Sequence, residues 1–248
     1  MSHQTPTRLP LIDSLRGVAI TLMIAYHFCY DLTYFRFVQF DFYRDPFWLN
    51  ARTLILSLFL LLVGVSLTLA AERRLPWRRY LRRLLIIGLC AGAISLSSYA
   101  LFEQRWIFFG VLHFIAVASV IGLPFVRWRW PSLLLGSGLI ALDRLYSHTL
   151  FDQPGLQWIG LMTHKPPTED YVPLIPWFGL VLIGIFLGRT LLLQSNLKSA
   201  AARTPGAAPL RILGWAGRSS LIIYMLHQPI LIGVLWLIRF LADGTSTA

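Results

Sequence analysis

Long apolar runs separated by short polar stretches recur along the whole sequence. Hydrophobic residues make up 56% of the 248 positions and charged residues only 13%, about half the charged share of an ordinary soluble domain. About 20 apolar residues suffice to cross the hydrocarbon core of a bilayer, and a helix satisfies its own backbone there. The sequence therefore predicts an all-α, polytopic transmembrane bundle. Because no polar segment is long enough for a separate core, we expect one membrane domain over residues 1–248.

The hydropathy pattern predicts about seven spans. The first is too long and too charged for a cleaved signal peptide. The last is the longest, and a kink is expected in it at Pro229. The approximate limits are Leu9–Phe35, Phe47–Ala71, Tyr80–Leu101, Phe109–Val126, Leu133–Tyr146, Val172–Leu193 and Ile212–Leu241.

Basic residues concentrate in alternate loops. Six arginines lie between Glu72 and Arg83, whereas the opposite loops are richer in aspartate and glutamate. The positive-inside rule then predicts a cytoplasmic N-terminus and a C-terminus outside. Juxtamembrane loops account for the net charge of +11, so no nucleic-acid partner is expected. Cys29 and Cys90 lie in different apolar runs, which favours neither a disulfide nor a metal site.

The first apolar run carries four ionisable residues. In IDSLRGVAITLMIAYHFCYDL these are Asp13, Arg16, His27 and Asp31. At about 100° per residue, all four fall within roughly 60° of one another on a helical wheel. Charged groups facing lipid are costly. The stripe is therefore expected to face the interior of the bundle.

The stripe consists of two pairs of residues, which we call its two stations. Asp13 and Arg16, spaced i, i+3, are expected to form an ion pair. His27 and Asp31, spaced i, i+4, suit a general base oriented by a carboxylate. Anchoring of the helix end and packing between helices are the non-catalytic alternatives for the two stations.

Further polar residues lie inside other apolar runs. Ser220, Tyr224 and His227 form a second stripe within about 60° in the last run. His227 is a candidate to orient the first stripe, to bind a ligand or to act as a base, and interhelical hydrogen bonding is its structural alternative. His113 and Trp106 lie towards the outer side of the fourth run, where an acceptor contact and an interfacial role are both open.

Several segments in this order resemble the transmembrane acyltransferase superfamily. They are IDSLRGVAI followed by a histidine, FLLLVGVSLTLA, WRRYLRRLLI, GVLHFIAVAS, DYVPLIPWFGLVLIGIFLGR and GRSSLIIYMLHQP. Within this superfamily the chain resembles bacterial relatives of the catalytic domain of heparan-α-glucosaminide N-acetyltransferase. The heparan branch carries a histidine after this first helix, whereas RFVQFDFYRDPF here has none. In this respect His27 resembles the polysaccharide O-acetyltransferase branch.

The resemblance implies transfer of an acyl group, usually acetyl, from cytoplasmic acyl-CoA to a hydroxyl or amino group of an extracytoplasmic glycan. It implies an enzyme of the bacterial inner membrane without a metal cofactor, and a homodimer is a possible state. His27 is the expected base, assisted by Asp31 and His227. Direct transfer and an acyl-histidine intermediate both stay open. Acceptor contacts are expected from His113 and Trp106, and acyl-CoA contacts from Arg16, Ser66, Arg79, Arg82, Arg83 and Tyr224.

The arginine cluster agrees with this expectation, because guanidinium groups bind phosphate oxygens in pairs. Topology alone is the alternative explanation of the cluster. Two other functions remain open: a proton-coupled transporter or flippase of a small or lipid-linked substrate, and a non-catalytic partner of a glycan assembly system. The apolar gap at Ile20 and Met23 disfavours a continuous proton relay along the first helix.

Overall fold

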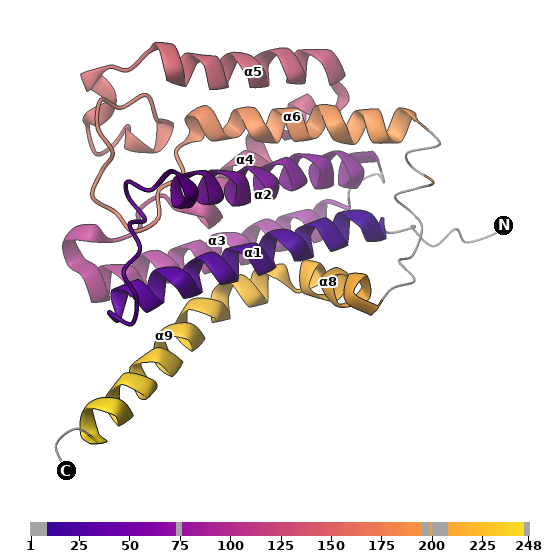
Figure 1. Cartoon of the computed structure of the whole chain (residues 1–248). Helices are drawn as coiled ribbons and strands as arrows, with labels where there is room; N and C mark the ends of the chain where they lie inside the picture. The colour runs from indigo at the N-terminus through magenta and orange to yellow at the C-terminus, as the bar shows by residue number, and fades with distance from the viewer. Residues whose placement is uncertain (1–8, 73–75, 195–198, 200–207, 246–248) are drawn as a thin grey trace. The chain divides into compact units, whose positions relative to one another are not determined.

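A computed structural model describes residues 9–72, 76–194, 199 and 208–245. These residues form helices and connecting loops and contain no strand, which confirms the all-α prediction (Figure 1). The α-helices are α1 (Pro10–Tyr34), α2 (Pro46–Glu72), α3 (Trp77–Phe102), α4 (Val111–Ile121), α5 (Arg129–Leu145), α6 (Leu174–Leu193), α8 (Ala208–Arg218) and α9 (Ser220–Thr245). Short 3-10 helices are η1 (Glu103–Arg105), η2 (Leu123–Arg127), η3 (Thr149–Asp152) and η4 (Gln157–Ile159).

Five of the described helices are long and apolar enough to cross a membrane. They are α1, α2, α3, α6 and the Ser220–Ala242 part of α9, so the chain is an integral membrane protein. The predicted fourth and fifth spans fall on α4 and α5, which have 11 and 17 residues. Helices of these lengths cover about 17 and 26 Å, less than the roughly 30 Å hydrocarbon core. The count of seven and the positions of the termini stay predictions.

The chain divides into two compact units. The first consists of Met1–Phe59 and Ser199–Ala248, and the second of Leu60–Lys198. Helix α1, the start of α2, and helices α8 and α9 belong to the first unit. The rest of α2 and helices α3 to α6 belong to the second.

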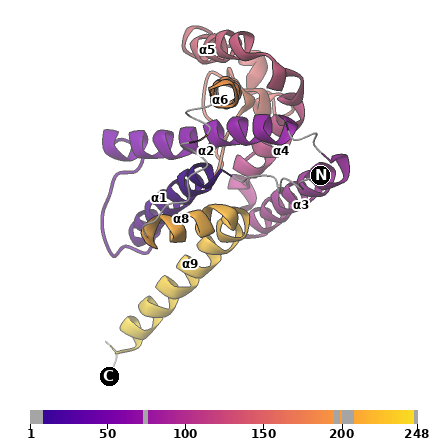
Figure 2. The same ribbon diagram turned by 90° about the vertical axis from the view of Figure 1, so that its right-hand side faces the viewer.

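In the first unit, α1 and α8 cross with their backbones in contact (Figure 2). A Cβ atom on Gly17 would lie 1.9 Å from the Leu213 carbonyl oxygen, and one on Gly217 would lie 1.8 Å from the Asp13 carbonyl oxygen. Only glycine permits such an approach. The opposite side of α8 exposes Ile212 and Trp215.

The predicted last span, Ile212–Leu241, is wrong at its start, because α8 ends at Arg218 and the membrane-length helix α9 begins at Ser220. The chain changes direction at Ser219 (Figure 1). The contact of Gly217 with α1 fixes the direction in which α8 crosses α1. The chain must therefore turn at Ser219 before α9 can run along α1. Helix α9 then continues through Pro229.

In the second unit, α6 is the most closely packed helix. A Cβ on Gly184 would lie 2.2 Å from the Leu61 carbonyl oxygen of α2, and one on Gly179 would lie 2.5 Å from the Gly136 carbonyl oxygen of α5. Helices α5 and α6 accordingly lie side by side in both views (Figures 1 and 2). Glycines on two sides of α6 therefore let it approach α2 and α5 at once.

Replacing Gly17 with alanine tests the α1–α8 crossing. We expect Gly17→Ala to lower the free energy of unfolding by about 1–3 kcal/mol, because the new methyl group must push the α8 backbone away. The measurement is thermal or denaturant unfolding in detergent. Gly233→Ala on α9 is the matched control, since a Cβ there meets nothing within 4 Å and alanine favours a helix interior by roughly 0.5–1 kcal/mol. Equal effects of both substitutions would contradict the crossing.

Candidate active site

Polar side chains of α1 and α9 meet in the first unit. His27 and His227 lie edge to face, with ring centroids 5.0 Å apart and an interplanar angle of 77°. Farther along the same two helices, the Gln228 amide Nε2 donates to the Asp31 carboxylate Oδ1 at 2.8 Å. The two stripes found on helical wheels therefore face each other, and they bring together two imidazoles, a carboxylate and an amide.

Main-chain contacts orient both imidazole rings. The His27 Nδ1 lies 2.9 Å from the Met23 carbonyl oxygen, and the His227 Nδ1 lies 2.6 Å from the Tyr224 carbonyl oxygen. A carbonyl oxygen can only accept, so each Nδ1 must carry the proton. In the neutral ring the lone pair is then on Nε2. Each histidine thus has its basic nitrogen on the side away from its own backbone.

The partner of Asp31 differs from the sequence-based expectation. That expectation gave Asp31 the role of orienting the His27 ring, whereas the contact at His27 Nδ1 comes from Met23. Asp31 is only 2% exposed, and its carboxylate is held by Gln228 of α9. Sequence reasoning did not select Gln228. Its position one residue after His227 was the available signal.

An aromatic cluster lies beside His27. The Tyr26 ring is 5.9 Å from the His27 ring and packs edge-on against Phe42 and Trp48, at 5.3 and 5.8 Å between centroids. Phe42 belongs to the loop after α1 and is buried, while Trp48 lies in the first turn of α2. Phe42 and Trp48 therefore pack on the far side of Tyr26 from His27 and close this side of the histidine site.

Asp13 and Arg16, near the start of α1, form the expected ion pair. Arg16 Nη1 lies 3.1 Å from the Asp13 carboxylate, and the same nitrogen lies 3.5 Å from the Gly217 carbonyl oxygen of α8. Ile20 and Met23, 1% and 5% exposed, separate this pair from His27. The two stations are therefore divided by close-packed apolar side chains.

The predicted acyl-CoA ligands divide between the two units. Arg79, Arg82 and Arg83 are exposed on the first turns of α3, in the second unit. Tyr80 lies among them and is buried, and its hydroxyl donates to the Ser119 carbonyl oxygen of α4 at 2.7 Å. This contact fixes the rotation of α3 and so the side from which the arginines project. Ser66 on α2 is partly buried, and Arg73 and Arg74 lie outside the described residues.

His113 holds the start of α4. The Gly110 amide donates to its Nδ1 at 3.3 Å, so Nε2 carries the proton towards Ser95 Oγ at 3.0 Å. The Val111 amide donates to the Asp170 carboxylate at 2.9 Å. Both ring nitrogens of His113 thus take part in local structure, and its contact with an acceptor stays a prediction. Trp106, predicted beside it, is 38% exposed.

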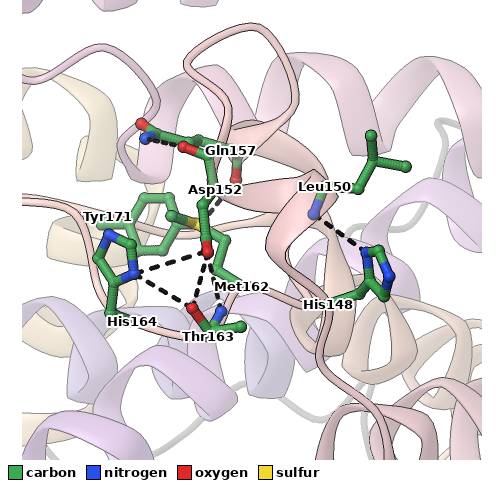
Figure 3. A network of polar contacts seen from close by, with 8 residues as sticks. All are labelled: His148, Leu150, Asp152, Gln157, Met162, Thr163, His164 and Tyr171. Carbon is green, nitrogen blue, oxygen red and sulfur yellow. Dashed lines mark hydrogen bonds and ion pairs between the residues drawn. The ribbon is translucent and has the colours of Figure 1, made fainter.

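The loop between α5 and α6 has a defined polar network (Figure 3). Asp152 accepts from the Thr163 hydroxyl at 2.7 Å and from the Thr163 amide at 2.9 Å, with His164 Nδ1 at 3.6 Å. These contacts, the Thr163 hydroxyl first, lower the pKa of the Asp152 carboxyl. The loop is therefore an ordered element of the second unit.

The family model of the heparan-alpha-glucosaminide N-acetyltransferase catalytic domain matches residues 8–229. The chain belongs to this family. No curated protein and no solved structure matches the chain significantly. The matched range contains α1 and the first part of α9, with His227 and Gln228, and membership implies acetyltransferase-type activity in a membrane.

The network at Asp152 leads to a measurable titration. A carboxyl with a lowered pKa contributes to stability at pH values above its ordinary pKa of 3.8, and this contribution is lost as the pH falls through the lowered value. Thr163→Val should raise the pKa of Asp152 towards 3.8, because it removes the hydroxyl donor. The measurement is carboxyl ¹³C NMR during acid titration, with Thr149→Val as the control. An unchanged pKa in Thr163→Val would contradict the assignment.

Proposed function

We propose that this protein transfers an acyl group, acetyl in the first instance, from cytoplasmic acyl-CoA to a hydroxyl or amino group of an extracytoplasmic glycan. Family membership supports acyl transfer, and the long apolar helices support a membrane setting. The proposed location is the bacterial inner membrane, with the N-terminus in the cytoplasm and the C-terminus outside. All of residues 1–248 act as one catalytic domain in this proposal, alone or as a homodimer.

The observation that carries the proposal is the imidazole pair of α1 and α9. Both rings are held through Nδ1, so that each presents a basic Nε2. A histidine base removes the proton that makes a hydroxyl or amino group a poor nucleophile. We assign this role to His27, and we assign His227, in contact with its ring, to the orientation of His27 and the acceptor.

The proposed step is direct transfer. The acceptor oxygen or nitrogen attacks the thioester carbonyl carbon, and its proton passes to His27 Nε2. The carbon–sulfur bond then breaks, and the proton passes from His27 to the departing CoA thiolate. Asp31 lies one turn farther along α1, and its negative charge stabilises the imidazolium that forms between these events.

The proposed donor contacts use arginine. CoA carries several phosphate charges, and the exposed Arg79, Arg82 and Arg83 can bind phosphate oxygens bidentately. Arg16, Ser66 and Tyr224 are assigned to the rest of the donor. Among the described residues, no group of three or more metal-binding side chains is placed to hold an ion, and the proposed step uses none.

Substituting the two histidines tests the base. His27→Gln should lower kcat for acetyl transfer by about 10²- to 10⁴-fold, the usual contribution of general-base catalysis. His227→Gln should have a smaller effect if it only orients the site. The measurement is acetyl-CoA consumption with cell-envelope glycans as acceptor, followed by mass spectrometry of the glycans. Leu22→Ala, at a 40% exposed position of α1, is the control. Retained activity in His27→Gln together with lost activity in His227→Gln would reverse the two roles.

Substituting the arginines tests the donor contacts separately. Arg82→Gln should raise the KM for acetyl-CoA by about 10- to 100-fold, because a charge-assisted hydrogen bond contributes roughly 1.5–3 kcal/mol. Added salt should weaken donor binding in the native protein. Arg144→Gln, an exposed arginine of α5, is the control for general loss of positive charge. Equal KM values in the two variants would contradict a donor contact at Arg82.

A further inference from the structure

Within the part of the chain that the structure describes, three buried polar atoms of the histidine site have no hydrogen-bond partner. They are Asp31 Oδ2, His227 Nε2 and Gln228 Oε1. Two come from consecutive residues of α9, and the third belongs to the carboxylate that Gln228 holds. Buried polar atoms without partners are rare in native proteins, and a group of them requires a reason.

All three atoms are hydrogen-bond acceptors. His227 Nδ1 faces a carbonyl oxygen and so carries the ring proton, which leaves a lone pair on Nε2. The Gln228 amide nitrogen faces Asp31 Oδ1, and the flipped amide would set oxygen against oxygen, so the free atom is the carbonyl Oε1. The remaining Asp31 atom is a carboxylate oxygen. The three unpartnered atoms therefore offer lone pairs and no donors.

Among the described residues, the Asp31 carboxylate also has no counterion. The ion pairs of Asp13, Asp152, Glu72 and Glu169 do not include it. A buried carboxylate is stable only where donors or a positive charge compensate it. The single bond from Gln228 leaves the other oxygen unmatched.

We propose that Asp31, His227 and Gln228 form a subsite that binds the acceptor substrate through the acceptor's own O–H or N–H groups. The class of ligand is a molecule with two adjacent donors, such as a vicinal diol or an amino alcohol, and anionic groups are excluded. The inference rests on the proposed function, to which it adds the recognition of the acceptor. Gln228 determines specificity, because its amide fixes Asp31 and supplies one of the three acceptors.

A skeleton-matched series of small probes tests the subsite without acyl-CoA. The probes are trans-1,2-cyclohexanediol, trans-2-aminocyclohexanol, cyclohexanol and trans-2-hydroxycyclohexanecarboxylate. Binding to the full chain in lipid nanodiscs is measured by saturation-transfer NMR, and empty nanodiscs correct for partition into lipid. The diol and the amino alcohol should bind about tenfold more tightly than cyclohexanol, because the single alcohol leaves buried acceptors unmatched. The carboxylate should not bind.

Variants at position 228 connect the selectivity to the subsite. Gln228→Leu should reduce the preference for the diol over cyclohexanol to less than twofold, since leucine offers no acceptor. Gln228→Glu keeps acceptors and adds negative charge, so it should favour the amino alcohol over the diol. Leu226→Ala, at a 51% exposed position of the same helix, is the matched control and should keep the native preference.

Several results would overturn the proposal. If only water occupies the site, the diol and cyclohexanol should bind with equal affinity, and this result would contradict the proposal. Native preference retained in Gln228→Leu, or tight binding of the carboxylate, would also refute the subsite. Acetyl-CoA consumption is measured on the same preparation. Probe selectivity without acetyl-CoA consumption would support the subsite and reject acyl transfer. Acetyl-CoA consumption without probe selectivity would reject the subsite and leave acyl transfer in place.

Discussion

The need to shield the polar stripe of α1 from hydrocarbon determines much of the first unit. Four ionisable residues lie on one face of this apolar helix, and each would be costly against lipid. Helices α8 and α9 provide the partners: the Gly217 carbonyl lies near Arg16, and the Gln228 amide binds Asp31. These contacts require close approach, which Gly17 and Gly217 permit. Because the chain turns at Ser219, α8 can cross α1 near its start, and α9 can then run along the later part of α1.

The same arrangement separates the stripe into an ion pair and a histidine site. Ile20 and Met23 fill the space between them. The histidine site orients both imidazole rings through Nδ1, and its carboxylate is held by one amide. Its surplus of acceptors distinguishes it from an ordinary helix contact, in which donors and acceptors balance.

The sequence predicted the helical class, the long apolar helices α1, α2, α3 and α6, and the face of α1 that carries the stripe, because these follow from hydropathy and a fixed helical period. It also predicted the pairing of Asp13 with Arg16, since residues three apart on a helix are neighbours. It did not predict Gln228 as the partner of Asp31, because a wheel gives the face of one helix and not its register against another. The turn at Ser219 was missed for a related reason: it depends on glycine contacts between α1 and α8. The structural role of His113 depends on Ser95 and the Gly110 amide, which hydropathy does not reveal.

The central claim is that α1 and α9 hold two imidazoles with protonated Nδ1 and basic Nε2. Solid-state ¹⁵N NMR of histidine-labelled protein in lipid bilayers measures this directly, with His27→Gln and His227→Gln spectra assigning the signals. The account predicts that at neutral pH both residues give a protonated Nδ1 and an unprotonated Nε2 signal. A proton on Nε2 of His27 in the resting protein would contradict it, because the lone pair required of the base would then face the Met23 carbonyl oxygen.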